Sequence, residues 1–184
     1  LGDRQQIVRV DRESAQPYPE EAEARLIAAA EAAMAASDVV VLSDYGKGAL
    51  TNPVLAAVLA AAQRAGKPVV VDPKRLDFAA YAGAAFITPN RKELEAAVGQ
   101  KANTDAEAEA AAAKAIAASG AAILMTRSEK GMSLFRSGKT PVHMGTQAKE
   151  VFDVSGAGDT VVAALALGVA AKVPVETGMT RAHS

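Results

Sequence analysis

Short runs of β-branched apolar residues alternate with longer, alanine-rich segments along most of the chain. A short continuous apolar run is typical of a buried strand, whereas apolar residues at helical spacing over a longer segment indicate a helix. The expected strands are 38–42, 68–71, 85–88 and 122–125. The expected helices are 19–36, 52–65, 92–98 and 104–119, with a further helix that begins near Gly156 and another start at 174–181.

Local signals mark the ends of two of these helices. Asn52 and Pro53 open the second helix, and Gly66 ends it. Thr104 is the expected N-cap of the fourth helix, with Glu107 three residues later to complete a capping box. These signals agree with the periodicity and support the element boundaries.

Strands that alternate with helices require crossover connections, which produce a mostly parallel sheet covered by helices on both faces. Two shorter runs, 132–135 and 140–144, flank Ser137-Gly138-Lys139 and predict a β-hairpin at the edge of that sheet. The expected fold class is therefore α/β, in one domain. The chain opens on a strand-like run, 5–10, and stops just after a helix start, so we expect a piece of a longer protein.

Composition and charge narrow the classes of function. The 184 residues carry 20 Lys and Arg against 21 Asp and Glu, a net charge of −1, which provides no basic surface for nucleic acid. The absence of cysteine and the presence of only two histidines exclude disulfides and metal sites built on thiolates or histidines. Without a spanning segment or signal pattern, we expect a cytoplasmic protein with small-molecule partners, binding neither nucleic acid nor membrane.

Polar residues follow the expected strands, at the end where open α/β sheets bind ligands. They are Asp44 and Lys47 after the first strand, Asp72 and Lys74 after the second, Asn90 and Glu93 after the third, and Thr126, Ser128 and Gly131 after the fourth. Any one of these segments could be an ordinary turn or cap, but four in succession on one edge favour a site. The first two pairs are candidate substrate or phosphate contacts, with a structural turn as the alternative.

The segment Ser155-Gly156-Ala157-Gly158-Asp159 precedes a run of small apolar residues at the start of the last helix. Backbone N–H groups without bulky side chains at a helix N-terminus form an anion hole that fits a phosphate. Asp159 would keep its charge beside the positive end of the helix and could take a proton from a hydroxyl that attacks phosphorus. The alternative is a Gly-rich cap in which Asp159 only complements the helix dipole.

The stretch from Asp153 to Ala166 resembles the C-terminal signature of the ribokinase-like (PfkB) carbohydrate kinases. In that family, the position of Asp159 is the catalytic base and the backbone of Gly156-Ala157-Gly158 stabilises charge on the transferred phosphoryl group. Asn90 and Glu93 match the Asn-x-x-Glu motif, which organises Mg²⁺ and the ATP phosphates through water. The segment 126–131 resembles the Thr-x-Gly-x-x-Gly nucleotide loop, with Ser128 where glycine is usual.

Within this family, the closer likeness is to the heptose 7-phosphate kinase domains of ADP-heptose synthesis. The stretches that carry it are 5–11, 42–50, 71–74, 124–134 and 143–166. The resemblance implies transfer of the γ-phosphate of ATP to the anomeric hydroxyl of the sugar phosphate, on the route to the lipopolysaccharide core. The alternatives are a kinase of the same family that acts on fructose phosphate, ribose, adenosine or a ketodeoxy acid, and a nucleotide-binding remnant without turnover.

The same resemblance implies how much of the fold is present. Residues 1–184 would be the C-terminal portion of a ribokinase-like kinase domain, with 1–11 ending a lid sheet and 19–184 forming the nucleotide-binding core. Much of the sugar pocket would then be missing, so we expect the isolated chain to phosphorylate sugar poorly. A lid strand at 6–10 would present an unpaired edge, which makes a homodimer through that strand a further hypothesis.

Overall fold

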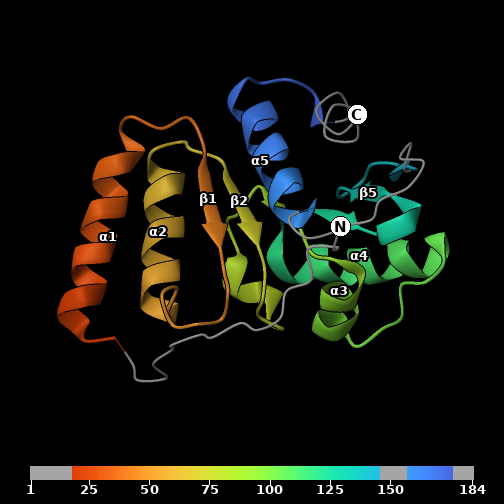
Figure 1. Ribbon diagram of the computed structural model, residues 1–184, viewed down its shortest axis with the longest axis horizontal. Helices are drawn as coiled ribbons and strands as arrows, with labels where there is room; N and C mark the ends of the chain where they lie inside the picture. Colours follow the sequence, from red (N-terminus) through yellow and green to blue (C-terminus); the bar gives the residue numbers. More distant parts are fainter. Residues whose placement is uncertain (1–17, 146–156, 176–184) are drawn as a thin grey trace, which may run out of the picture.

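A six-stranded sheet runs through the part of the chain that the computed structural model describes, residues 18–145 and 157–175 (Figure 1). Its strands are β1 (Val40–Ser43), β2 (Val69–Asp72), β3 (Phe86–Ile87), β4 (Ala122–Thr126), β5 (Met132–Phe135) and β6 (Val142–Met144). They lie side by side in the order of the sequence. The first four pair in parallel, and β5 and β6 add two antiparallel strands at one edge.

Helices connect the strands at the expected places. They are α1 (Glu20–Met34), α2 (Asn52–Arg64), the 3₁₀ helix η1 (Phe78–Tyr81), α3 (Arg91–Val98), α4 (Asp105–Ser119), the 3₁₀ helix η2 (Ser128–Lys130) and α5 (Ala157–Ala170). The capping box at Thr104 is confirmed: its hydroxyl accepts from the Glu107 amide, and the Glu107 carboxylate accepts from the Thr104 amide. The strand expected at 5–10 lies outside the described residues, as does all but the start of the segment 174–181.

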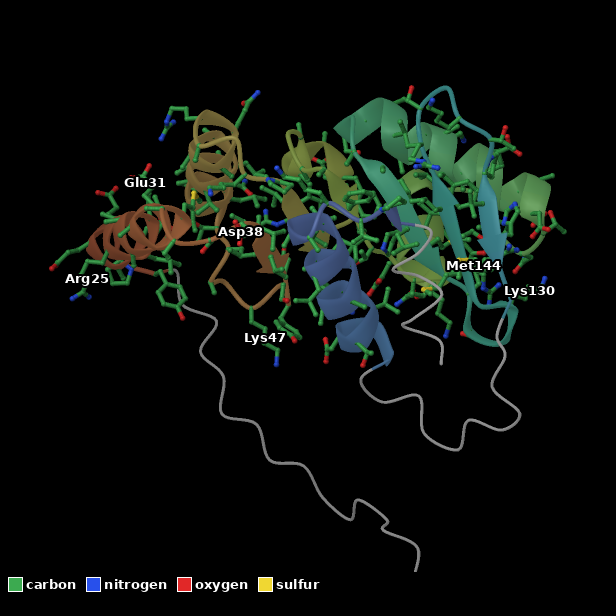
Figure 2. The ribbon with its side chains drawn as sticks, turned by 90° about the horizontal axis from the view of Figure 1, so that it is seen from above. Arg25, Glu31, Asp38, Lys47, Lys130 and Met144 are labelled. Carbon is green, nitrogen blue, oxygen red and sulfur yellow. The ribbon has the colours of Figure 1, made fainter. Side chains whose placement is uncertain are left out.

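Helices cover both faces of the sheet (Figure 2), as expected for an α/β fold. Alternation along β2 divides its side chains between the faces, because successive residues of a strand point to opposite sides. Val69 and Val71 join the core beneath α2 and α4, whereas Val70 packs with Leu165 of α5 on the other face. Full burial of such side chains contributes about 1.5–3 kcal/mol each. The expected parallel sheet with an edge hairpin is confirmed.

Helix α5 brings residues from late in the sequence to the ends of the first two strands. It packs against β1 and β2, and its N-terminal turn lies near the carboxyl end of β2 (Figure 1). None of the described helices combines the length and hydropathy needed to cross a bilayer.

Candidate active site

The carboxyl ends of the four parallel strands meet along one edge of the sheet. Ser43, at the end of β1, pairs with Asp72, at the end of β2. The segments after β3 and β4 are also joined, because Asn90 and Thr126 form an isolated parallel bridge. The Thr126 amide donates to the Pro89 carbonyl at 3.0 Å. The structure therefore gathers the polar strand-end segments that the sequence singles out.

Asn90 and Glu93 form a capping box at the start of α3. The Asn90 side-chain oxygen accepts from the Glu93 amide at 2.9 Å, and Glu93 Oε2 accepts from the Asn90 amide at 2.8 Å. Each side chain thus satisfies a backbone donor that the helix start would otherwise leave unpaired. This mutual bond holds both side chains at the edge of the sheet. The Asn-x-x-Glu spacing is also that of a capping box, so the same motif that predicts a metal-organising pair contained the signal for this helix start.

Lys74 ties the end of β2 to the same helix. Its ammonium donates to Glu93 Oε1 at 2.5 Å, so Glu93 uses one carboxylate oxygen for the cap and the other for Lys74. This hydrogen bond is the main reason that the pKa of Lys74 is raised, with the charge of Glu93 adding to it. The ion pair leaves Lys74 47% exposed. Lys74 therefore remains accessible to a ligand at the edge.

Asp72 lies among like charges. Partial burial raises the pKa of its carboxyl group, the charge of Glu93 raises it further, and Lys74 opposes both effects. Smaller contributions come from Asp159 and Asp44, which places all these carboxylates near one another. Such a concentration of negative charge is costly in the absence of a cation, and perturbed carboxylates of this kind occur often at functional sites.

Asp159 lies in the first turn of α5, and its side chain is exposed. The charge of Asp159 acts on Asp72, which places Asp159 at the carboxyl edge of the strands. Ala157 and Gly158 precede it in the same turn. Gly156 and the rest of the signature from Asp153 lie outside the described residues. The structure thus gives the position of Asp159, while its role as the base and the anion hole both stay predictions.

Asp44 is buried within a network that the sequence did not reveal. Its carboxylate accepts from the Gly46 amide at 2.9 Å, from Arg75 Nε at 2.7 Å and from the Tyr81 hydroxyl at 2.9 Å. Burial raises the pKa of Tyr81, and its bond to Asp44 raises it further. Arg75 also donates to Asn52 and to the Leu50 carbonyl. These contacts give Asp44 an anchoring role in the loop after β1, the structural alternative considered for it.

Lys47 belongs to the same loop as Asp44 and lines a cavity at the end of β1. Figure 2 shows its side chain on the side of the sheet that α5 covers. Together with Ser43, Tyr45 and Leu50 it lines a cavity of about 360 Å³ at the end of β1. Lys47 therefore remains a candidate contact for an anionic substrate.

The turn between β4 and β5 has left-handed or positive-φ backbone at both Ser128 and Gly131. Ser128 has a φ of 52°, the left-handed region that glycine adopts without strain. Gly131 has a φ of 79°, and a Cβ atom there would lie 1.9 Å from the Met144 carbonyl oxygen. The turn therefore lies directly against the end of β6 at Met144. Ser128 thus has a backbone conformation that glycine would also adopt.

The donor set decides how Mg²⁺ and ATP would be held. The described residues contain no cluster of three or more acidic or histidine side chains arranged to ligate a metal. Both carboxylate oxygens of Glu93 and the side-chain oxygen of Asn90 already accept hydrogen bonds. These residues would therefore hold Mg²⁺ and phosphate oxygens through water. The excess negative charge around Asp72 fits a site that receives a cation with its ligand.

Comparisons with known proteins match this arrangement. A family model described as pfkB family carbohydrate kinase matches residues 2–184. The chain is 50% identical over 184 residues to the bifunctional protein HldE of Azorhizobium caulinodans, covering 100% of this chain and 38% of that protein. It is 51% identical over 168 residues to the HldE of Caulobacter vibrioides, covering 90% of this chain and 34% of that protein. The chain thus spans between a third and two fifths of these relatives.

Solved structures agree on the fold. Arabidopsis thaliana ribokinase, complexed with ribose and ATP, superposes with a TM-score of 0.74 at 24% identity over 83% of this chain and 49% of its own. Phosphofructokinase-2 from Escherichia coli, in complex with fructose-6-phosphate, gives a TM-score of 0.69 at 19% identity over 85% of this chain and 53% of its own. The described architecture is therefore ribokinase-like, and it spans about half of those chains.

Proposed function

Because this chain belongs to the pfkB family of carbohydrate kinases, we propose that it carries the phosphoryl-transfer part of an ATP- and Mg²⁺-dependent heptose 7-phosphate kinase. The acceptor would be the anomeric hydroxyl of the sugar phosphate. Two observations support this choice among the sugars of the family: the stretches 42–50 and 124–134 resemble heptose kinases, and the curated relatives at about half identity are HldE proteins. The residues 1–184 would form the later part of the complete kinase domain.

The position of Asp159 carries the proposal. Asp159 lies in the first turn of α5, close to Asp72 at the carboxyl edge of the parallel strands. There it would accept the proton of the sugar hydroxyl as that oxygen attacks the phosphorus. The amides at the start of α5 would stabilise the negative charge that develops on the transferred group. No covalent enzyme intermediate is required, because phosphoryl transfer depends mainly on positioning and charge stabilisation.

The other residues of the edge would bind and orient the nucleotide. Bound Mg²⁺ would neutralise charge on the phosphates. Asn90 and Glu93, fixed by their capping box, would hold that ion and the phosphates through water. Thr126, Ser128 and Gly131 would border the nucleotide, since their turn is joined to Asn90 by the bridge at Thr126.

A screen of sugar acceptors with the complete kinase tests this function. Heptose 7-phosphate, fructose 6-phosphate, ribose, adenosine and a ketodeoxy acid would each be offered with ATP and Mg²⁺. We expect turnover with heptose 7-phosphate, and phosphorus NMR of the product should show a new phosphate on the anomeric carbon. Preferred turnover with another acceptor would reassign the substrate within the family.

The second candidate is a nucleotide-binding unit without turnover. It applies to the isolated chain of 184 residues, because the chain spans about half of the solved kinases that it resembles. Calorimetry of the isolated chain with ATP and Mg²⁺, alongside a turnover assay, distinguishes the two. Binding without turnover by the isolated chain, together with turnover by the complete kinase, is the expected result.

A further inference from the structure

The guanidinium of Arg127 is buried beneath the turn between β4 and β5. Arg127 is 5% exposed, and its Nη1 donates to Asp105 Oδ1 at 2.5 Å and to Ser133 Oγ at 3.2 Å. Its Nε and Nη2 are buried and have no hydrogen-bond partner in the described part of the chain. The Asp105 side chain is 67% exposed, so the ion pair reaches from the interior to the surface at the start of α4.

A buried guanidinium is a costly way to fill this space. Arginine cannot lose its charge to reduce the cost of burial, and unpartnered buried donors add to that cost. Replacement of a buried ion pair by apolar side chains of similar volume is often neutral or stabilising. Packing alone therefore does not explain why an arginine occupies this buried position.

Those contacts fasten the turn to α4. The Arg127 amide donates to the Gly131 carbonyl at 2.7 Å, and the Gly131 amide donates to the Ser128 carbonyl at 2.9 Å, which closes the turn. The Arg127 side chain then joins this turn to Asp105. A second cation of the turn reaches the same region, because Lys130 Nζ donates to the Asn103 carbonyl at 2.8 Å. Both cations of the turn thus attach it to the segment that starts α4.

The contacts of Arg127 also continue toward the hairpin. Ser133, on β5, lies 2.8 Å from His143 Nδ1 on β6, so the Arg127 guanidinium connects α4 with both strands of the hairpin. On the opposite side, Thr126 is bridged to Asn90. Ser128 follows these two attachments directly and has a left-handed conformation, which serine adopts only at a steric cost.

We propose that Arg127 is a positioning residue for the nucleotide: by joining the 126–131 turn to α4 and β5, it holds Thr126 and Ser128 in the orientation that binds ATP. The proposal rests on the proposed function, in which this turn borders the nucleotide. Arg127 would act without touching ATP, since its side chain is directed into the protein toward Asp105 and Ser133.

Arg127→Met in the complete kinase separates positioning from packing. Methionine fills similar space but offers no donors, so the melting temperature should be unchanged or higher. KM for ATP should rise by about ten-fold with a smaller change in kcat, because ground-state binding is what a displaced turn loses. Arg127→Lys, which can still reach Asp105, should recover part of the affinity. Arg64→Met, which removes an exposed arginine paired with Glu31 on α1, should leave KM for ATP unchanged.

The KM for ATP of these variants decides whether Arg127 positions the nucleotide turn. A normal KM for ATP in Arg127→Met, at any melting temperature, overturns the positioning role. If Arg127→Met does not fold, Asp105→Ala is the second test, because it removes the exposed carboxylate that accepts from Arg127. The proposal then requires a raised KM for ATP in Asp105→Ala. A normal KM for ATP in that variant overturns the proposal. Absence of sugar phosphorylation in the wild-type kinase would instead refute the proposed function, so the two failures are distinguishable.

Discussion

The Lys74 ammonium lies 2.5 Å from Glu93 Oε1 and joins the end of β2 to the first turn of α3. Glu93 already accepts the Asn90 amide with its other oxygen, so Lys74 completes the set of bonds that fixes this carboxylate. The pair sits beside Asp72, whose pKa is raised chiefly by burial and by Glu93. Lys74 can therefore pair either with Glu93 or with a phosphate at this edge of the sheet.

Lys74→Met should affect catalysis more than stability. An ion pair this exposed contributes only about 0–1 kcal/mol to folding, so the melting temperature should change little. In the complete kinase, kcat/KM for ATP should fall by roughly ten-fold or more, as expected when a charge-assisted contact to phosphate or to Glu93 is lost. Lys101→Met, which removes an exposed lysine near Glu95, is the matched control. Equal kcat/KM for ATP in the two variants would show that Lys74 has only a structural role in the turn after β2.

Asp159→Asn keeps the size of the side chain but removes the proton acceptor. General-base assistance contributes about 10²–10⁴-fold, so kcat of the complete kinase should fall by that order with little change in KM for ATP. Loss of a charge that merely complements the helix dipole would cost about 0.3–1 kcal/mol of stability and spare turnover. Melting temperature and kcat are measured on the same preparation. Near-normal kcat with a lowered melting temperature would mean that Asp159 only caps α5.

Asp72→Asn should stabilise the protein near neutral pH. The folded-state pKa of Asp72 is raised, so its ionisation costs more in the folded than in the unfolded protein. The free energy of unfolding of the wild type is therefore lowered progressively as the pH rises from the pKa of Asp72 in the unfolded protein through its pKa in the folded protein. Below the unfolded-state pKa this loss of stability is absent. Melting curves from acidic to neutral pH should show the variant more stable only at the higher values.

Glu107→Gln should have the opposite effect on stability to Asp72→Asn. Backbone hydrogen bonds from Thr104 and Asn103 lower the pKa of Glu107, so its contribution to stability is present above the unfolded pKa and is lost as the pH falls through the folded one. The variant should therefore be less stable near neutral pH. A gain for Glu107→Gln, or a loss for Asp72→Asn, at neutral pH would contradict the electrostatic description of the two carboxylates.

Ser128→Gly should raise the free energy of unfolding by about 0.5–1 kcal/mol, because glycine adopts the left-handed conformation without the steric cost that serine incurs. Denaturant unfolding measures the change. Gly131→Ala provides the contrast, since its Cβ would meet the Met144 carbonyl, and should be strongly destabilising. Gly138→Ala has a similar positive φ with open space around it and should cost less than Gly131→Ala. A destabilised Ser128→Gly would show that the hydroxyl group makes a contact that outweighs the strain.

Local chemistry along the chain was sufficient to predict the α-helices and strands that the structure describes, although not the two 3₁₀ helices. Apolar runs such as 68–71 predicted buried strands, and Thr104 with Glu107 predicted a helix start, because periodicity and capping act over a few neighbouring residues. The family likewise followed from contiguous motifs, above all the segment around Asp159. These signals need no knowledge of distant contacts.

Only the tertiary structure decided which charged side chains meet. The register of β1 with β2 and the path of the following loops bring Tyr81 to Asp44, 37 residues away, and Lys74 to Glu93, 19 residues away. Arg127 meets Asp105 because the turn after β4 lies against the start of α4. Burial then determines what each pairing costs, since a charge removed from water is stabilised only by the partners that the fold places beside it. No local pattern contains that information, which is why the sequence left Asp44 between a ligand contact and a structural turn and did not single out Arg127 at all.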